Sequence, residues 1–184
     1  MKPFFYLSLL LLFIGCNNPK ELSLSEKEEY LALGDSITGN TQMVLLSNVS
    51  KQIQQNGTLG AVDFCSEKAV FLTDSLSSKY THKIQRLTDK SRNPQNQLRS
   101  EIDKKAWEEL KNNPDHHHLV LQENSSVYYY KSIPLGMPAC LQCHGNPQTD
   151  ISPETIKLIR QKYPQDKATG YEMGDFRGMW KIEL

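Results

Sequence analysis

The sequence predicts an α+β domain in which helices, concentrated in the N-terminal half, cover an antiparallel sheet. Apolar residues recur at intervals of three and four up to about residue 112, and at alternate positions in several later segments. Because helices come early and strands mostly late, this order favours an antiparallel sheet over the alternating units of a parallel one. The length of 184 residues, 38% hydrophobic and 23% charged, suits one globular domain with a substantial core.

Three helices are predicted in the N-terminal half. The first covers residues 36–55, where Leu45, Val49 and Ile53 have helical spacing, and Gly57 and Gly60 end it. The second covers residues 61–77, and its apolar stripe contains Cys65, so this thiol should face whatever the helix packs against. The third covers residues 100–112, with a proline at position 114 as its stop.

The later segments predict mostly strands. "HLVLQE" and "VYYYKSI", separated by "NSS", indicate a hairpin over residues 118–133. "SPETIKLIRQKYP" indicates a helix that is capped by Ser152, has Pro153 at its first position and ends before Pro164. In the tail, "GYEM" and "MWKIEL" flank the turn sequence "GDFRG", which predicts a second hairpin.

The N-terminus reads as an export signal. Lys2 precedes an apolar run over residues 4–14, which breaks at "FIGCNN". This pattern resembles a bacterial lipoprotein signal, which implies removal of residues 1–15 and acylation of Cys16. A plain secretory signal or a short uncleaved anchor are the alternatives. Residues 16–29 are polar and charged, so we expect a tether that holds a domain at residues 30–184 to a membrane, on its periplasmic side.

Charge and cysteine content narrow the function classes. The formal net charge is zero, so no nucleic-acid partner is expected. With Cys16 assigned to the lipid, Cys65, Cys140 and Cys143 remain. An odd number of cysteines in an exported protein argues against a pure disulfide framework, so at least one thiol needs another role.

The segment "CLQCH" carries the clearest chemistry. Cys140 and Cys143 stand three apart with His144 directly behind, which is the attachment signature of c-type haem. A roughly helical turn puts both thiols on one side, where they can form thioethers with the two haem vinyl groups, and His144 can reach the iron. Covalent attachment in bacteria follows export, so the motif and the signal agree on one covalent haem c.

Two other functions also use a CxxC motif. A thioredoxin-like CxxC should open a long helix, whereas this motif runs into Gly145, Asn146 and Pro147. A Cys3His zinc site could combine the three cysteines with one of the five histidines, but such ligands usually come as two spaced pairs and Cys65 stands alone.

A haem iron takes a second axial ligand unless it binds an outside molecule. Cys65 is a candidate because it lies on an apolar helix face, although a small buried thiol is a common structural residue. Met137 is too close to the attachment site to cross the ring. The histidine and methionine candidates are His82, His116, His117, His118, Met43, Met173 and Met179.

Four segments, "AVDFCSEKA", "RLTDKSRNPQN", "PACLQCHG" and "YPQDKATGYEMGDFRG", occur in an order that resembles a family of bacterial c-type haem domains. The family is catalogued as a domain of unknown function, and its members often precede sensor kinases. The resemblance covers nearly all of residues 30–184 and implies a PAS-like antiparallel sheet covered by helices. It also implies that Cys140 and Cys143 carry the haem and that His144 and Cys65 are the axial ligands. Residues that would hold the haem propionates or frame the pocket are Arg92, Asn93, Pro94 and Asn96.

These observations favour a redox or small-gas sensor module, with an electron-transfer cytochrome c as the alternative. A Cys65 thiolate would favour ferric iron and lower the reduction potential, and its loss on reduction would open a site for a small ligand. The expected partners are the membrane, a redox protein or a small gas, and no enzymatic activity is expected. "YLALGDSITGN" resembles the first block of GDS(L) esterases, with Ser36, Asp115 and His118 as formal matches. No GxND block follows, and the surrounding helices do not fit that fold.

Overall fold

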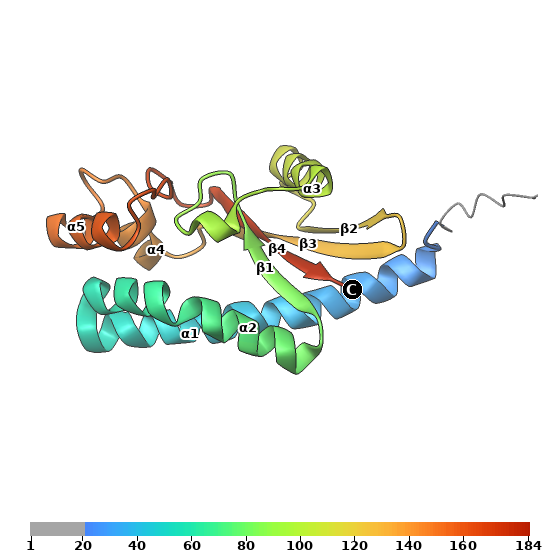
Figure 1. Ribbon diagram of the computed structural model, residues 1–184. Helices are drawn as coiled ribbons and strands as arrows, with labels where there is room; N and C mark the ends of the chain where they lie inside the picture. Colours follow the sequence, from blue (N-terminus) through green and yellow to red (C-terminus); the bar gives the residue numbers. More distant parts are fainter. Residues whose placement is uncertain (1–20) are drawn as a thin grey trace, which may run out of the picture.

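The structure, a computed structural model, describes residues 21–184 (Figure 1). The predicted signal peptide and the lipidation site at Cys16 lie outside the described residues. The elements of the described chain are, in order, α1 (Leu24–Glu67), α2 (Ala69–Tyr80), β1 (Lys83–Leu87), the 3-10 helix η1 (Pro94–Asn96), α3 (Glu101–Asn112), β2 (His118–Glu123), β3 (Ser126–Pro134), α4 (Pro138–His144), α5 (Pro153–Lys162) and β4 (Phe176–Glu183).

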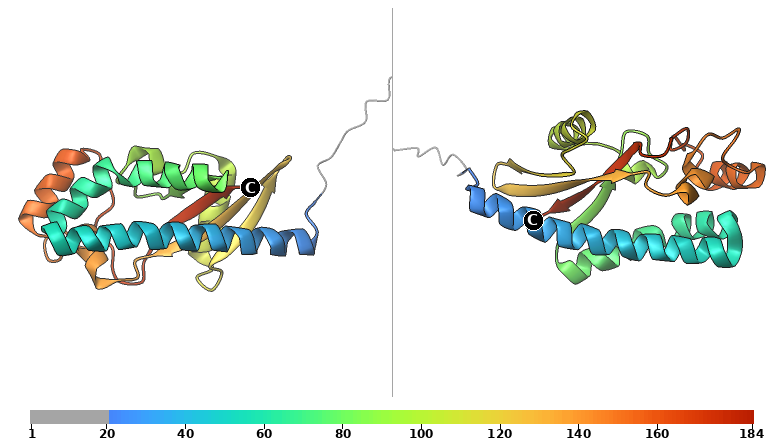
Figure 2. Two further views of the ribbon diagram at one scale, coloured as in Figure 1. Left: turned by 90° about the horizontal axis from the view of Figure 1, so that it is seen from below. Right: turned by 180° about the vertical axis from the view of Figure 1, so that it is seen from behind.

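The strands form one open antiparallel sheet in the order β1-β4-β3-β2, so the last strand of the chain lies between the first and the third. Helices α1 and α2 run side by side along one face of this sheet, and α3 covers the other face (Figures 1 and 2). Helices α4 and α5 lie beyond one end of the sheet, beside the part of α1 that precedes α2 (Figure 1).

Each face of the sheet has its own core. Because successive strand residues point to opposite faces, the adjacent Tyr129 and Tyr130 of β3 enter different clusters, and both are fully buried. Tyr129 packs with Ile37 and Trp180 between the sheet and α1. Tyr130 packs with Trp107 between the sheet and α3. These two neighbouring tyrosines therefore anchor β3 in the cores on both faces of the sheet.

The predicted fold class is confirmed: the N-terminal half is helical and the sheet is antiparallel. The hairpin over 118–133, the helix over 100–112 and the helix predicted to begin at Pro153 are also found, with Ser100 and Ser152 as the N-caps of the two helices. Helix α1 begins at Leu24, so residues 24–29, expected in the tether, are helical.

The predicted second hairpin is wrong. Only β4 forms in the tail, and its partners are β1 and β3, because Trp180 and its neighbours find a better apolar surface in the middle of the sheet. Strand β1 was not predicted. Its sequence "KIQRL" has only two apolar residues in five, which is too weak a pattern to distinguish a strand from a loop.

Gly57 turns the chain back on itself. Its φ of 68° and ψ of −169° interrupt α1 and lie in a region that essentially only glycine occupies. The chain then returns toward the sheet through the last turns of α1 and through α2, which Figure 2 shows beside the first part of α1. This reversal places Cys65 on the returning segment, opposite α4.

The esterase-like "GDS" segment is accounted for by packing. Gly34 has no room for a side chain, because a Cβ there would overlap the ring of Tyr129. Asp35 accepts hydrogen bonds from the Tyr129 hydroxyl at 2.8 Å and from Lys131 Nζ at 2.6 Å, and lies 2.8 Å from His118 Nδ1. Ser36 is exposed in the middle of α1, away from any strand-to-helix turn. The segment therefore fastens α1 to the sheet.

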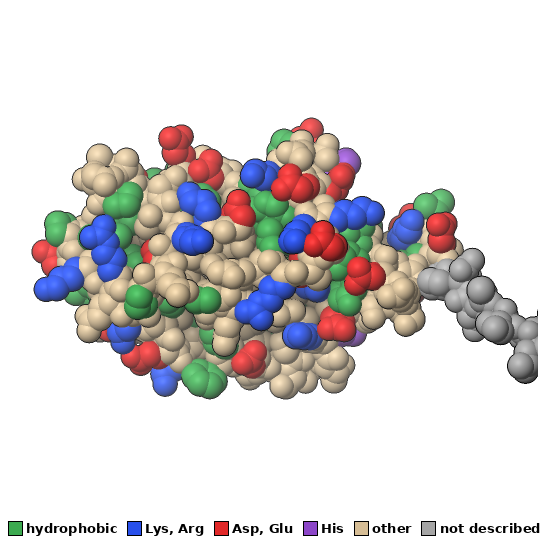
Figure 3. Space-filling model, turned by 45° about the horizontal axis from the view of Figure 1, so that its top comes forward, with side chains coloured by type: hydrophobic (Ala, Val, Ile, Leu, Met, Phe, Trp, Pro, Cys, Tyr) green, Lys and Arg blue, Asp and Glu red, His purple; other side chains and the backbone are tan. Residues whose placement is uncertain are grey.

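On the face drawn in Figure 3, acidic and basic side chains are interspersed. None of the helices in residues 21–184 combines the length and the hydropathy needed to cross a membrane.

Candidate cofactor site

The CxxCH motif forms helix α4. Pro138 occupies its first turn, the helix spans seven residues, and the Gly145 N–H closes it on the Leu141 carbonyl. Cys140 and Cys143 are unpaired and half-buried, one turn apart. Burial raises the pKa of the Cys143 thiol to about 11 against the opposing charge of Arg92, so this thiol is protonated at neutral pH.

His144 is oriented by a backbone carbonyl. Its Nδ1 lies 2.8 Å from the Ala168 carbonyl oxygen. A carbonyl can only accept, so Nδ1 carries the proton and Nε2 is left as a lone-pair donor. Burial, with the nearby charges of Arg92 and Arg177, holds the pKa of His144 well below its usual range. A neutral imidazole fixed by its other nitrogen is the form in which histidine binds metals.

Arg92 fastens this helix to two loops. Its Nε and Nη2 bind the two Asp166 carboxylate oxygens at 3.1 and 3.2 Å, and Nη2 also donates to the carbonyls of Cys143 at 2.7 Å and Ala168 at 3.3 Å. The Arg92 and Asp166 side chains are 12% and 7% exposed. Through Nε and Nη2 this guanidinium binds one carboxylate and two carbonyls, so its first role here is structural.

A cavity of about 460 Å³ lies between the motif helix, the returning segment of α1 and the edge of the sheet at β1 and β4. Its size falls in the range of about 300–1,000 Å³ typical of small-molecule and cofactor sites. Most of its wall is aliphatic, from α1, α2 and the segment after β3. The polar and sulfur-bearing residues on its wall include Cys65, Arg86, Arg92, Asn96, Cys140, Cys143, His144, Tyr163 and Arg177.

Cys65 faces this cavity from the side opposite α4. Burial raises the pKa of its thiol, and the nearby charges of Arg86 and Arg92 act against that rise. Conversely, a charge on Cys65 contributes to the raised pKa of Cys143, so the two sulfurs share one electrostatic environment. The structure thus brings Cys65 to the same cavity as Cys140, Cys143 and His144, which follow it by 75 to 79 positions in the sequence.

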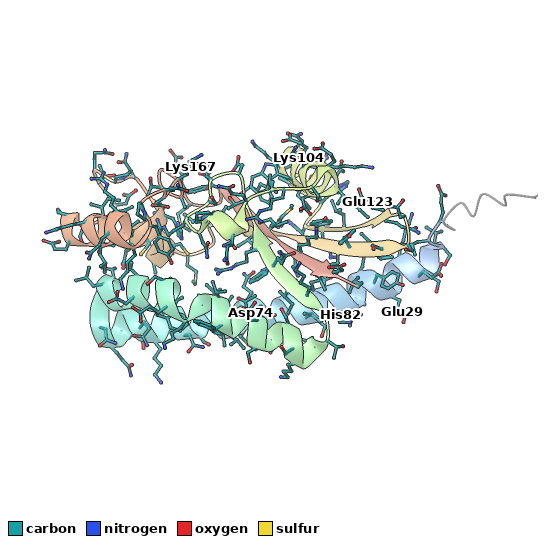
Figure 4. All side chains as sticks on the ribbon, in the orientation of Figure 1. Glu29, Asp74, His82, Lys104, Glu123 and Lys167 are labelled. Atoms are coloured by element: carbon teal, nitrogen blue, oxygen red, sulfur yellow. The ribbon has the colours of Figure 1, made fainter. Side chains whose placement is uncertain are left out.

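The other candidates for a second axial ligand lie elsewhere, apart from Met137, which lines the cavity next to the motif. His82 lies at the turn between α2 and β1, at the end of the molecule away from α4 (Figure 4), where its Nδ1 lies 3.1 Å from the Glu183 carbonyl oxygen. Met179 is buried under α3 on the far face of the sheet. The remaining candidates do not line the cavity: His116, His117, His118, Met43 and Met173.

Only some of the residues predicted to frame the pocket line the cavity. Asn96 lines the cavity, whereas the Asn93 side chain caps η1 by accepting from the Gln95 N–H at 3.0 Å, and neither Asn93 nor Pro94 lines the wall. Within residues 21–184, no three His, Cys, Asp or Glu side chains converge closely enough to hold a metal ion, which argues against the Cys3His zinc alternative. A flat macrocycle with one ligand on each face requires no such convergence.

Residues 23–184 match the sequence model of the Tll0287-like family. The chain belongs to this family. Among solved structures, the crystal structure of the cyanobacterial heme-protein Tll0287 is similar, with a TM-score of 0.69 and 22% sequence identity over 85% of this chain and 94% of that chain. At this identity the likeness shows the fold. No curated protein matches the chain.

The four sequence segments indicated membership of a domain family, and the sequence model identifies that family as Tll0287-like. The matched residues include all of α1, and with it residues 24–29. The cavity residues that the sequence did not indicate include Arg86, Tyr163 and Arg177. Arg86 could have been found only by recognising β1, since its neighbours there set the face to which it points.

Proposed function

We propose that this Tll0287-like chain binds one haem covalently, as a c-type haem, in the cavity between α1 and α4. The observation that carries the proposal is that one mostly apolar cavity contains two half-buried thiols in a CxxCH turn, a neutral His144 with a free Nε2, and Cys65 on the opposite wall. The wall residues include three arginines and no Asp or Glu, which suits a cofactor that bears carboxylates.

The residues take distinct roles. Each thiol of Cys140 and Cys143 adds across one vinyl group, so that a C–S bond forms, the thiol hydrogen moves to carbon and no electrons are exchanged. His144 Nε2 and Cys65 Sγ would hold the iron, and the aliphatic wall from α1 and β3 would exclude water. The bound haem supplies a redox-active iron, whose potential a thiolate ligand lowers.

We assign the biological role to redox or small-gas sensing. Cys65 Sγ carries no proton while it is a ligand. A haem bound here would supply an iron that a partner protein could reduce by one electron, and Cys65 Sγ would then take up one proton from water and give up its place to CO or NO. Electron transfer is the alternative class, and Cys65 then stays bound in both states.

The test is to express the full chain with the bacterial haem-attachment machinery and to record oxidised and reduced absorption spectra of the wild type, Cys65→Ser and Met137→Leu. We expect covalent haem in all three, a changed ferric spectrum in Cys65→Ser and an unchanged one in the methionine control. A colourless protein would overturn the haem proposal, and an unchanged spectrum in Cys65→Ser would overturn the ligand assignment. CO binding to the ferrous form identifies a sensor, whereas fast electron self-exchange without ligand binding identifies a carrier.

We also propose export and lipidation at Cys16, which would hold the domain at the membrane facing the periplasm. Support comes only from the sequence pattern of residues 1–16. Mass spectrometry of the mature chain is expected to show residues 1–15 removed and an acylated first cysteine, and detergent partitioning should be lost in Cys16→Ser.

A further inference from the structure

The cavity wall carries more positive charge than the protein itself neutralises. Arg86, Arg92 and Arg177 all line it, and no Asp or Glu does. The mutual repulsion of these guanidinium groups contributes to the lowered pKa of Arg177, although burial is the main cause. A cation removed from water is costly unless a partner compensates it, so each arginine needs an acceptor.

Two of the three arginines have acceptors. Arg92 is held by the Asp166 carboxylate and by two carbonyls. Arg177 donates from Nη1 to Thr88 Oγ1 at 3.2 Å and to the Lys90 carbonyl at 3.5 Å, and lies over the Tyr171 ring. Its Nε is buried without a partner, but that nitrogen is also closed off from the cavity.

Arg86 has no acceptor. Among the described residues its guanidinium makes no hydrogen bond and no ion pair, and its contact is with the ring face of Trp180, 5.9 Å from the centroid. Burial lowers its pKa, and the opposing influence comes from Cys65 and Tyr163, both on the cavity wall. All five N–H donors of this side chain are therefore free to meet a ligand.

We propose that Arg86, rather than Arg92 or Asn93, binds a carboxylate of the cofactor, namely a haem propionate. The inference rests on the proposed haem function and deepens it. Arg92 and Asn93, for which the family resemblance suggested this role, already have their acceptor and donor partners within the protein. Arg86 is the cavity arginine whose planar fork is unused, and a carboxylate matches that fork in shape and charge.

The test removes either partner of the pair in turn. In the full chain with Cys140→Ser and Cys143→Ser, haem binds without covalent attachment, so its affinity can be measured by spectroscopic titration. We compare Arg86→Gln with the parent for two probes, haem and haem dimethyl ester, in which both carboxylates are blocked. Arg99→Gln, at an exposed arginine outside the cavity, is the matched control.

We expect Arg86→Gln to weaken haem binding by about tenfold to a hundredfold, the worth of hydrogen bonds to a charged group, and to leave ester binding within about twofold. Equal losses for both probes, or no loss for haem, would overturn the assignment to Arg86. A parent chain that binds neither probe, together with a wild type that acquires no covalent haem, would instead overturn the proposed function.

A second measurement guards against a general folding defect. Because Arg86 has no acceptor in the haem-free chain, Arg86→Gln should unfold at the same midpoint as its parent or at a higher one. A lower midpoint, or a variant that does not fold without haem, would show that Arg86 is structural and would overturn the proposal.

Discussion

Gly34→Ala provides the sharpest test of how α1 is seated on the sheet. An added Cβ would overlap the ring of Tyr129, which is fully buried and cannot swing aside without losing its hydrogen bond to Asp35. Overpacking costs about 1–3 kcal/mol, and a lost hydrogen bond to a charged group about 1.5–3 kcal/mol. The helix-propensity gain of about 1 kcal/mol offsets part of this, so the free energy of unfolding should fall by about 1.5–5 kcal/mol.

Gly39→Ala is the matched control. Gly39 lies in the same helix, and a Cβ there meets nothing within 4 Å, so only the propensity gain operates. This variant should be more stable by about 0.5–1 kcal/mol. Urea unfolding followed by tryptophan fluorescence measures both variants. Shifts of the same sign and size in the two variants would refute the close packing of α1 on Tyr129.

Three further predictions follow from the ion pairs and the turn of the fold. Arg92→Met leaves Asp166 buried without its partner and should lower stability by about 3–5 kcal/mol, whereas Lys104→Gln, at an exposed ion pair, should cost under about 1 kcal/mol; thermal unfolding compares them. Burial acts to raise the pKa of Asp103, but hydrogen bonds from Lys181, Ser100 and Tyr130 outweigh it and lower the pKa below 3.8. The ionised carboxylate therefore stabilises the fold above pH 3.8, and this stabilisation is lost as the pH falls through the lower folded pKa. In acid unfolding curves, the stability difference between the wild type and Asp103→Asn should shrink below the folded pKa. Gly57→Ala forces a positive φ on alanine and should lose about 1–3 kcal/mol in the same urea assay, and a gain like that of Gly39→Ala would refute the strained turn.

The sequence predicted those parts of the site that are local. Cys140, Cys143 and His144 lie within five positions, so their spacing alone defined their chemistry and their helical turn. Cys65 was placed on an apolar helix face by its periodicity, but only the family resemblance connected it to the motif. Nothing local records the reversal at Gly57 that brings the two together.

Pairing between distant segments explains the remaining differences between the predicted and the observed elements. "MWKIEL" has the alternation of a strand and is one, but its partners β1 and β3 lie far away in sequence, and a neighbouring hairpin was the simplest guess. In the same way, the local sequence does not show which of the three cavity arginines has an acceptor. Arg92 differs from Arg86 because the fold brings it acceptors from distant segments, chief among them the Asp166 carboxylate 74 positions away.

The two walls of the cavity are held with unequal strength, and this bears on the proposed ligand switch. On the α4 side, the buried Arg92–Asp166 pair and the carbonyl contacts of Arg92 fix the motif. On the Cys65 side, α1 meets α5 through a small cluster around Val62 and Ile159 and through the solvent-screened pairs of Lys162 with Asp63 and Glu67. Loss of the Cys65 ligand would therefore be accommodated by the α1 wall, since separating it from α5 breaks weaker interactions than moving His144 would.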